Sequence, residues 1–530
     1  MENRVRFAPS PTGKVHVGNI RTAIFNYLFA RHTGGKFLLR VEDTDRERST
    51  QEAIDALLEC MEWLGLEFDE EIMYQSQRAQ NHIDSVNKLI EEGKAYKAKS
   101  KDGEATPTLF KIPFNADNIS CIREVGEHSI KVHPDEAVII SDAGVNYAQV
   151  SKKGKPIPEL GCLAGFKSLK VYNDSDELIF DLDTVLDEVL SGEKSIELTS
   201  ATKFTFIRRE VFFNDLIKGE LAKPLDTIKD LVIVRSDGSP VFHIANVCDD
   251  VVQKVTHIVR GDDHVENTYR HILLFEALDY NPPQYAHLPM IVNKQGKPYS
   301  KRDGDAFVGD FRAKGFMSEA LFNYLTLLGW SPGDDREKMT KEELISSFEL
   351  ERVKSSPAQL DLVKLQNLNG LYIADMPFDL FLDNVKEVIP SCSWYEKNEE
   401  DMLVKVAKLM QSRTKSFANF DAWSYFFTDE VEYDRKTLKK ALKNDVVRTA
   451  LSELKEVFVS IEEFNAESIN AAISNIAEKH ELGFKLNQPL RVAVTGIGNG
   501  ADLLDTLVII GKDSCIERIG KALNYNFETD

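Results

Sequence analysis

The start of the chain alternates between short apolar runs and segments of helical period. Residues 4–8 can form a strand, which the following prolines end because they have no backbone N–H to donate. From Val17 the apolar residues recur on one face of a helix, and Gly34-Gly35 ends it. Residues 36–41 predict a second strand, followed by an acidic turn and another helix. This β-α-β-α order predicts a parallel sheet.

The pattern changes twice further along the chain. Residues 97–205 hold short β-rich pieces between polar turns, which predicts an inserted domain of mixed β character. The α/β pattern returns at residue 230, and after about residue 310 nearly every segment has helical period. We therefore expect an α/β region interrupted by a β-rich insertion and followed by an all-α region.

Composition narrows the class of protein. The 530 residues include 65 Lys plus Arg and 86 Asp plus Glu, which gives a net charge of −21. No apolar run is long enough to span a membrane, and the N-terminus lacks the pattern of a secretory signal. The six cysteines form no CxxC pair, which argues against a disulfide framework and fits a reducing cytoplasm. Strong acidity disfavours non-specific adhesion to nucleic acid but leaves room for a local basic face.

The first motif that carries chemistry is RFAPSPTGKVHVGN at residues 6–19, where a strand, a turn and a helix start follow one another. Helix N-termini bind phosphate because their N–H groups are free and their end carries partial positive charge. Gly18 lets a base or ribose approach the backbone closely. His16 and Asn19, one turn apart, can both donate toward a phosphate oxygen. Alone, this motif is more typical of a capped surface loop.

The second motif is YSKRDG at residues 299–304. The adjacent cations Lys301 and Arg302 suit a mobile clamp on a polyphosphate, because an ammonium can follow negative charge as it develops. Alone, the motif is weak evidence for a polyphosphate site, since such pairs are common on protein surfaces.

Together, in this order, the two motifs resemble the HIGH and KMSKS signatures of class I aminoacyl-tRNA synthetases. Longer stretches such as LLRVEDTDRERS and HIVRGDDHVENTYRHILL resemble glutamyl-tRNA synthetase. LNQPLRVAVTGIGNG and LLDTLVIIGKDSCIERIGKAL resemble the C-terminal helical part of its bacterial form. The resemblance covers residues 1–95 and 207–530.

The resemblance implies a Rossmann-like class I synthetase catalytic domain with a β-rich insertion, followed by an all-α anticodon-binding region. The implied domains are the first catalytic half at 1–95, an inserted acceptor-end domain with an atypical extra segment at 96–206, the second catalytic half at 207–310, a helical connecting domain at 311–375 and the anticodon-binding domain at 376–530. The stretch between residues 115 and 205 matches no pattern, and it could brace the acceptor stem, dock a partner or be inert.

The resemblance also implies a glutamate pocket. Arg6 and Arg260 match the family's carboxylate-binding arginines, and a planar guanidinium can bind a carboxylate bidentately. Glu42 matches the acid that holds the α-ammonium group. The other residues implied for this pocket are Ala8, Ser10, Phe242 and Asn246. A structural role for Arg6, Glu42 and Arg260 as ion pairs is the alternative.

The ATP-binding residues implied by the resemblance are His16, Gly18, Asn19, Asp263, Ser300, Lys301 and Arg302. His16, Asn19 and Lys301 are the implied catalytic residues, which act by aligning substrates and stabilising charge at the reacting phosphorus.

Three departures from the family pattern affect these expectations. Phe242 stands where relatives often have Tyr, which removes one polar contact worth about 1 kcal/mol. Pro298-Tyr299 replaces the usual opening of the second signature. Many bacterial relatives carry a cysteine-containing, sometimes zinc-binding subdomain after residue 96; here Cys121 and Cys162 lie too far apart in sequence for the usual site, so we predict no zinc.

A cationic run at residues 435–448 is the expected tRNA contact, because phosphate contacts dominate affinity for nucleic acid. Its lysines are predicted to share one helical face; they are Lys436, Lys439, Lys440 and Lys443. Such a run is usually a solvated face, but the implied anticodon-binding domain favours contact with RNA.

The resemblance thus implies a glutamate–tRNA ligase that uses ATP with Mg²⁺ as substrate, activates L-glutamate and charges tRNA(Glu). We further expect a cytoplasmic monomer with no membrane partner. A nondiscriminating enzyme that also charges tRNA(Gln) and a catalytically inactive binding protein remain alternatives. The segment 376–530 argues against the shorter paralogue that glutamylates a modified tRNA base.

Overall fold

The computed structural model describes residues 2–11, 13–44, 49–98, 106–116, 119–395, 400–418 and 420–526. The chain divides into two compact units. The first comprises Met1–Val308 with Leu325–Leu360, and the second comprises Gly309–Tyr324 with Asp361–Asp530.

The strands at the start of the first unit form a parallel sheet. β1 (Arg4–Phe7), β2 (Lys36–Val41) and β3 (Met73–Tyr74) lie in this order, and both neighbouring pairs run parallel. α1 (Val17–Thr33) connects β1 to β2 and ends at Gly34, whose φ of 66° is left-handed and suits glycine. The predicted β-α-β order and parallel pairing are confirmed for these residues.

A seven-stranded sheet joins the inserted segment to the rest of this unit. Its main path is β11 (Leu178–Asp181), β10 (Phe166–Tyr172), β13 (Lys203–Asp215), β17 (Gln284–Leu288) and β16 (His257–Gly261), with β6 (Ile122–Lys131) and β14 (Gly219–Pro224) also paired to β13. β13 meets β17 in parallel where Asp215 pairs with Tyr285. One long strand therefore belongs both to the insertion and to the sheet that carries β16 and β17.

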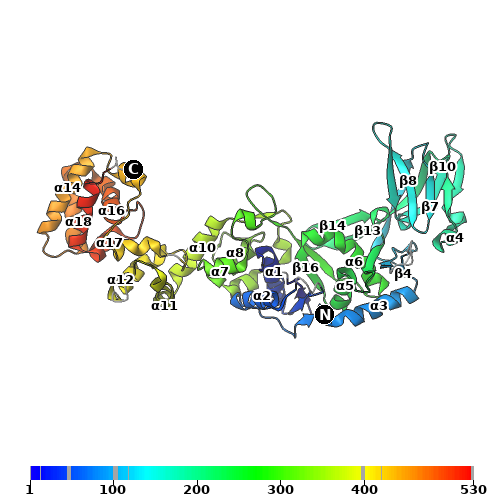
Figure 1. Cartoon of the computed structure of the whole chain (residues 1–530), viewed down its shortest axis with the longest axis horizontal. Coiled ribbons are helices and arrows are strands. Elements are labelled where there is room, and N and C mark those ends of the chain that lie inside the picture. The colour runs from blue at the N-terminus through cyan, green and yellow to red at the C-terminus, as the bar shows by residue number, and fades with distance from the viewer. Residues whose placement is uncertain are drawn as a thin grey trace. The chain divides into compact units, whose positions relative to one another are not determined.

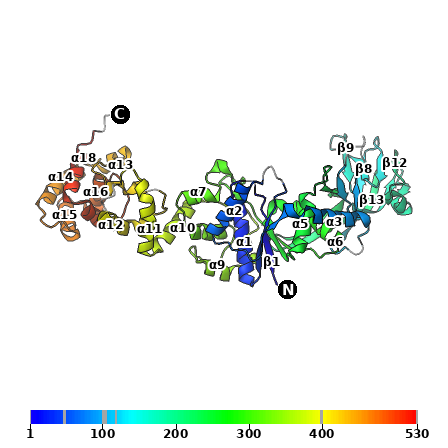
Figure 2. The same ribbon diagram turned by 60° about the horizontal axis from the view of Figure 1, so that its bottom comes forward.

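The insertion has a β core of its own. Its antiparallel sheet consists of β12 (Ile196–Leu198), β7 (Val138–Ser141), β8 (Gly144–Val150) and β9 (Pro156–Gly161), in that order. Ile140 and Val145 are buried in one cluster with Phe166, Phe204 and Phe206. The strands β7, β8 and β10 lie grouped in cyan in Figure 1, and the turned view in Figure 2 shows β8, β9, β12 and β13 together. The predicted mixed β character is confirmed in the described residues.

The remaining elements of the first unit include two small sheets. These elements are α2 (Gln51–Trp63), α3 (Ala79–Glu91), β4 (Ala95–Lys97), β5 (Thr108–Phe110), α4 (Leu186–Leu190), β15 (Leu231–Val234), α5 (Phe242–Val252), α6 (Val265–Ala277), β18 (Ile291–Val292), α9 (Lys341–Ser347) and β19 (Ala358–Gln359). The two small sheets are β15-β5-β4 and β18-β19.

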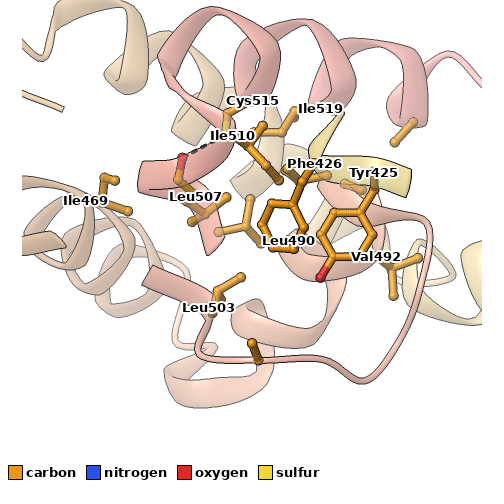
Figure 3. Packing of buried hydrophobic residues seen from close by; sticks show 14 of the residues in the cluster. Tyr425, Phe426, Ile469, Leu490, Val492, Leu503, Leu507, Ile510, Cys515 and Ile519 are labelled. Carbon is orange, nitrogen blue, oxygen red and sulfur yellow. Dashed lines mark hydrogen bonds between the residues drawn. The ribbon is translucent and has the colours of Figure 1, made fainter. Parts of the chain in front are cut away.

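The second unit is helical, as predicted for this part of the chain. Its helices are α7 (Val308–Ala313), α8 (Ser318–Leu327), α10 (Leu362–Asp375), α11 (Phe378–Val388), α12 (Glu400–Met410), α13 (Arg435–Ala441), α14 (Asp445–Ser460), α15 (Ala466–Lys479), α16 (Asn487–Thr495), α17 (Leu503–Ile510) and α18 (Lys512–Leu523). Phe426, Leu490 and Leu507 pack together in its core (Figure 3), where the Cys515 thiol lies 3.6 Å from the Leu507 carbonyl oxygen. Across the part of the chain that the structure describes, no helix has both the length and the apolar character needed to cross a bilayer.

Candidate active site

A cavity of about 690 Å³ opens where β1, β2 and β16 end and where α1 and α5 begin. This position agrees with the rule that ligands bind beyond the carboxyl ends of parallel strands. The structure brings most of the predicted site residues to its wall: Arg6, Ala8, Ser10, His16, Gly18, Asn19, Glu42, Phe242, Asn246, Arg260 and Asp263.

Arg6 has a buried counterion inside the protein. Its Nε donates to Asp250 Oδ1 at 3.0 Å, and Arg40 Nη1 donates to the same oxygen at 2.6 Å. Burial alone would raise the pKa of Asp250, but the guanidinium groups of Arg40 and Arg6 outweigh it and hold that pKa below its usual range. The alternative of structural ion pairs is therefore correct for Arg6 with Asp250 and for Glu42, whose Oε1 lies 3.5 Å from Arg40 Nη2, although Arg6 and Glu42 also line the cavity.

Arg260 is buried without any such counterion. Its Nη2 donates to Thr268 Oγ1 at 2.6 Å and to the His264 carbonyl at 3.3 Å, and its Nε donates to His287 Nε2 at 3.3 Å. Within the described residues it forms no salt bridge with a carboxylate, and burial lowers its pKa to about 10. A buried cation held only by neutral partners is costly unless an anion joins it. Arg260 is therefore placed to receive a negatively charged ligand.

A buried chain of polar groups fixes the orientation of Arg260. His287 Nδ1 donates to Asp215 Oδ2 at 2.6 Å, so Nε2 is free to accept from Arg260 and from Thr268 Oγ1 at 2.9 Å. Asp215 is the last residue of β13, so the strand shared with the insertion anchors this chain. Sequence analysis missed Asp215, His287 and Thr268, because separate strands and a helix bring them together.

The opposite charge in the cavity comes from Glu42. Burial raises the pKa of Glu42, and the guanidinium groups of Arg40 and Arg6 oppose this effect. Glu42 Oε1 accepts from Asn246 Nδ2 at 2.7 Å, whereas the buried Asn246 Oδ1 has no hydrogen-bond donor among the described residues. A carboxylate oxygen and an orphaned carbonyl oxygen are acceptors suited to an ammonium group.

His16 caps the helix that follows the first motif. Its Nδ1 accepts from the Gly18 N–H at 3.1 Å, which places the ring proton on Nε2. Burial lowers the pKa of His16, and a hydrogen bond with the Tyr299 backbone opposes this effect. One ring nitrogen of His16 is engaged in capping, and the Nε2 proton is the donor that it can offer a phosphate, so the predicted donor role of His16 and Asn19 stays a prediction.

The two motifs are joined through the backbone. Val17 N donates to the Ala306 carbonyl at 2.9 Å, and Val308 N donates to the Val15 carbonyl at 3.0 Å. The loop after the second motif is thus held beside the start of α1.

An internal capping arrangement fixes the turn of the second motif. The Ser300 N–H and hydroxyl each donate to Asp303 Oδ2 at 2.9 Å, and Asn293 Nδ2 donates to Asp303 Oδ1 at 2.7 Å. Pro298 and Tyr299 line the cavity, whereas Ser300 and the exposed Arg302 do not. The side chain of Lys301 lies outside what the structure describes.

Aromatic and imidazole rings form another wall of the cavity. The Phe242 ring lies within 6 Å of the rings of His243, His264 and His271. His243 Nδ1 lies 3.0 Å from His271 Nε2. Burial, assisted by nearby arginines, lowers the pKa of His243 to about 4 and that of His271 well below its usual range. Both imidazoles are neutral at pH 7, so the arginines supply the positive charge of this region.

The lysines predicted to contact tRNA lie in the second unit. Lys436, Lys439 and Lys440 are exposed on α13. The prediction that Lys443 shares their helical face is wrong, because α13 ends at Ala441 and Asn444 caps the next helix. The asparagine side chain competes with helical hydrogen bonding and restarts the helix after it.

Comparison with known proteins decides the family. A family model of the catalytic domain of class I tRNA synthetases (E and Q) matches residues 2–106 and 202–367, and an anticodon-binding domain model matches 381–523. The chain belongs to the class I tRNA synthetases of the E and Q group. The resemblance inferred from the motifs and the predicted fold class are confirmed. Residues 107–201 fall outside both models.

Full-length relatives share this organisation. Glutamate–tRNA ligase 2 of Thermoanaerobacter pseudethanolicus is 34% identical over 532 residues, covering 99% of this chain and 98% of that protein. The glutamate–tRNA ligase of Francisella philomiragia is 33% identical over 522 residues, covering 98% of each. A crystal structure of a glutamate tRNA ligase from Elizabethkingia meningosepticum with its amino acid matches with a TM-score of 0.67 and 27% identity, covering 99% of this chain and 100% of that one.

Proposed function

We propose that this class I synthetase is a glutamate–tRNA ligase, which activates L-glutamate with Mg-ATP and transfers it to the 3′-terminal adenosine of tRNA(Glu). Relatives with this name align with almost the whole chain. The aminoacyl-tRNA synthetase family supports the use of ATP and tRNA.

The observation that carries the choice of amino acid is the missing counterion of Arg260. A dicarboxylic amino acid supplies that anion, while its ammonium group reaches Glu42 and the Asn246 carbonyl oxygen. The α-carboxylate must remain free to attack phosphorus, so we assign Arg260, with Arg6 beside it, to the side-chain carboxylate. Ala8, Ser10 and Phe242 shape the same pocket.

The reaction has two steps. An α-carboxylate oxygen of glutamate attacks the α-phosphorus of ATP, and pyrophosphate leaves. A ribose hydroxyl of the terminal adenosine then attacks the carbonyl of glutamyl-adenylate, and AMP leaves. Neither step needs a covalent intermediate on the protein, so catalysis consists of alignment and stabilisation of charge.

The nucleotide belongs at the start of α1. The Nε2 proton of His16, the Asn19 amide and Lys301 are assigned to the charge on the reacting phosphates. Gly18, where a Cβ would lie 3.3 Å from the His16 ring, is assigned to the same ATP site. Asp263 is assigned to the ribose or base. Ser300 and Arg302 are assigned to the same ATP-binding turn.

A tRNA-dependent ATP–pyrophosphate exchange assay with glutamate tests the proposal. We expect exchange in the wild-type protein and a loss of at least 100-fold in kcat for Lys301→Ala. The exposed Lys294, in the turn before the second motif, provides the matched control Lys294→Ala, which should keep full activity. Wild-type protein without exchange, although it binds tRNA(Glu), would identify an inactive binding protein.

Which tRNAs the enzyme charges is a separate question. The Phe242 side chain carries no hydroxyl, so it offers glutamate no hydrogen bond, but this bears on the amino acid rather than on the anticodon. Charging assays with tRNA(Glu) and tRNA(Gln) distinguish a discriminating enzyme from one that charges both. We assign this enzyme to tRNA(Glu) alone.

We assign residues 1–95 and 207–310 to catalysis, 96–206 to the acceptor end, 311–375 to the connection and 376–530 to the anticodon. Phosphate contacts by Lys436, Lys439, Lys440 and Lys443 fit the last assignment.

We further propose a cytoplasmic monomer without bound zinc. Among the described residues, no group of three or more His, Cys, Asp or Glu side chains is arranged to hold a metal. Elemental analysis of the purified protein and its mass in solution test the zinc and monomer assignments.

A further inference from the structure

The second unit exposes one aromatic ring almost completely. Phe484 has 92% of its surface accessible, while every other exposed large apolar residue of the described chain reaches 63% or less. Phe is normally among the more buried residue types. The ring thus forgoes the stabilisation that burial would give.

The backbone around Phe484 holds the ring outward. Leu482 and Leu486, two residues to either side, are 8% and 0% exposed and anchor the segment in the core. Leu482 N donates to the Ala477 carbonyl at 2.8 Å, and Lys485 N donates to the Leu482 carbonyl at 3.0 Å. Gly483, with a φ of 52°, supplies the left-handed turn that points the next side chain away from the core. The exposure of Phe484 therefore follows from an anchored turn rather than from a frayed end.

Of the basic side chains near this turn, two contact a carboxylate and one does not. Lys479 and His480 both contact Glu453 Oε2, at 2.8 and 3.0 Å. Lys485, next to the ring, is exposed and forms no ion pair with the described residues. An exposed cation thus follows the exposed ring directly in sequence. This pair matches what an unpaired nucleotide offers, namely a flat base and a phosphate.

We propose that Phe484 stacks on an unpaired base of the bound tRNA and that Lys485 contacts an adjacent phosphate. The proposal rests on the proposed function, and it is supported by the position of both residues within the part of the chain that matches an anticodon-binding domain. A protein partner fits less well, because protein interfaces need a contiguous apolar core and the residues next to Phe484 along the chain are Gly483 and Lys485.

Three substitutions separate stacking from simple apolar contact. Phe484→Ala removes the ring, Phe484→Leu keeps an apolar side chain without a flat face, and Phe484→Trp keeps a stacking surface. We expect the first two to weaken binding of a tRNA(Glu) transcript about tenfold or more, and Phe484→Trp to bind like the wild type. Val459→Ala, at a residue 53% exposed in the same unit, is the matched control and should bind normally.

Kinetics and fluorescence give two further readouts on the full-length protein. Phe484→Ala should raise the KM for tRNA while leaving kcat at saturating tRNA and the KM for glutamate unchanged. Anticodon stem-loops with 2-aminopurine at one unpaired position at a time should show a change in fluorescence at a single position, present with wild type and absent with Phe484→Ala. Lys485→Ala should reduce the slope of log affinity against log salt by about 1.

Normal tRNA affinity in Phe484→Ala, or normal affinity in Phe484→Leu with no fluorescence change at any position, would overturn the proposal and leave the ring to a protein partner. Failure of the proposed function is distinct, because the wild-type protein would then fail to form glutamyl-tRNA.

Discussion

Arg260→Met should raise the stability of the protein and lower its activity. Burial lowers the pKa of Arg260 to about 10. The difference from the pKa of a free arginine means that keeping the buried side chain charged costs the folded protein about 3 kcal/mol. Methionine keeps an unbranched apolar stem but removes the charged guanidinium group. Thr268 and His287 keep their mutual hydrogen bond at 2.9 Å, so the lost contacts offset only about 1 kcal/mol. We expect the free energy of unfolding to rise by about 2 kcal/mol.

Activity should change in the other direction. Loss of a buried, charge-assisted contact to a substrate carboxylate costs about 3 kcal/mol in the transition state, so kcat/KM for glutamate should fall by about 100-fold or more. The assays are urea unfolding of the ligand-free protein and tRNA-dependent pyrophosphate exchange over a range of glutamate concentrations. Excess glutamate should stabilise the wild type against urea and leave the variant unchanged.

Arg40→Met is the matched control, since Arg40 is fully buried but shares the counterion Asp250 with Arg6. Its removal leaves the buried Glu42 without its ion pair to Arg40 Nη2, at 3.5 Å, and Asp250 with Arg6 alone, and it should lower the free energy of unfolding by about 3 to 5 kcal/mol. The reasoning would be refuted if Arg260→Met were destabilised as strongly as Arg40→Met, or if it kept the wild-type KM for glutamate.

Three further predictions address neighbouring groups. Glu42→Gln should raise the KM for glutamate at least tenfold with little change in the KM for ATP, measured by pyrophosphate exchange, because it removes the anion that faces the ammonium group; equal effects on both substrates would contradict this role. Asp215→Asn should weaken glutamate binding several-fold, because Asp215 acts through its hydrogen bond to His287 and not by contact with substrate. It should also alter the pH profile of kcat/KM for glutamate, whereas an unchanged profile would leave Asp215 a purely structural role. The pKa of His243 is lowered to about 4, so His243 takes up a proton at higher pH in the unfolded chain than in the folded protein. The free energy of unfolding should therefore fall by up to about 3 kcal/mol as the pH decreases from about 6.5 to 4. Urea unfolding of His243→Gln over the same pH range should show a smaller decrease.

Local signals explain why the sequence was informative about the start of the fold. The end of α1 depends on one left-handed residue, Gly34, and its beginning on the cap at His16, so neighbours in sequence determine both. The cavity position followed from the same logic, since strand ends and helix starts are local features that converge at one edge of a parallel sheet.

Long-range contacts account for what the sequence did not reveal. Asp250 is more than 200 residues from Arg6 and Arg40 in sequence yet forms ion pairs with both, and no spacing rule connects these residues. The role of His287 depends on Asp215 from a different strand. The error at Lys443 has the opposite origin, because periodicity extended the helix past Ala441 to Lys443, where the chain has already left α13 before Asn444 caps the next helix.

With Arg260 assigned to the side-chain carboxylate, as proposed above, the distribution of counterions would let the pocket select glutamate without a hydroxyl from Phe242. Glutamine has almost the same shape as glutamate, so steric fit cannot separate them. Bound glutamine would place a neutral amide against Arg260 and leave that guanidinium buried and uncompensated, whereas Arg6 already shares Asp250. The neutral His243 and His271 add no charge of their own to this wall. Selection therefore rests on the charge of the ligand, and an Asp250→Asn substitution, which deprives Arg6 of its partner, should change protein stability more than it changes the preference for glutamate over glutamine.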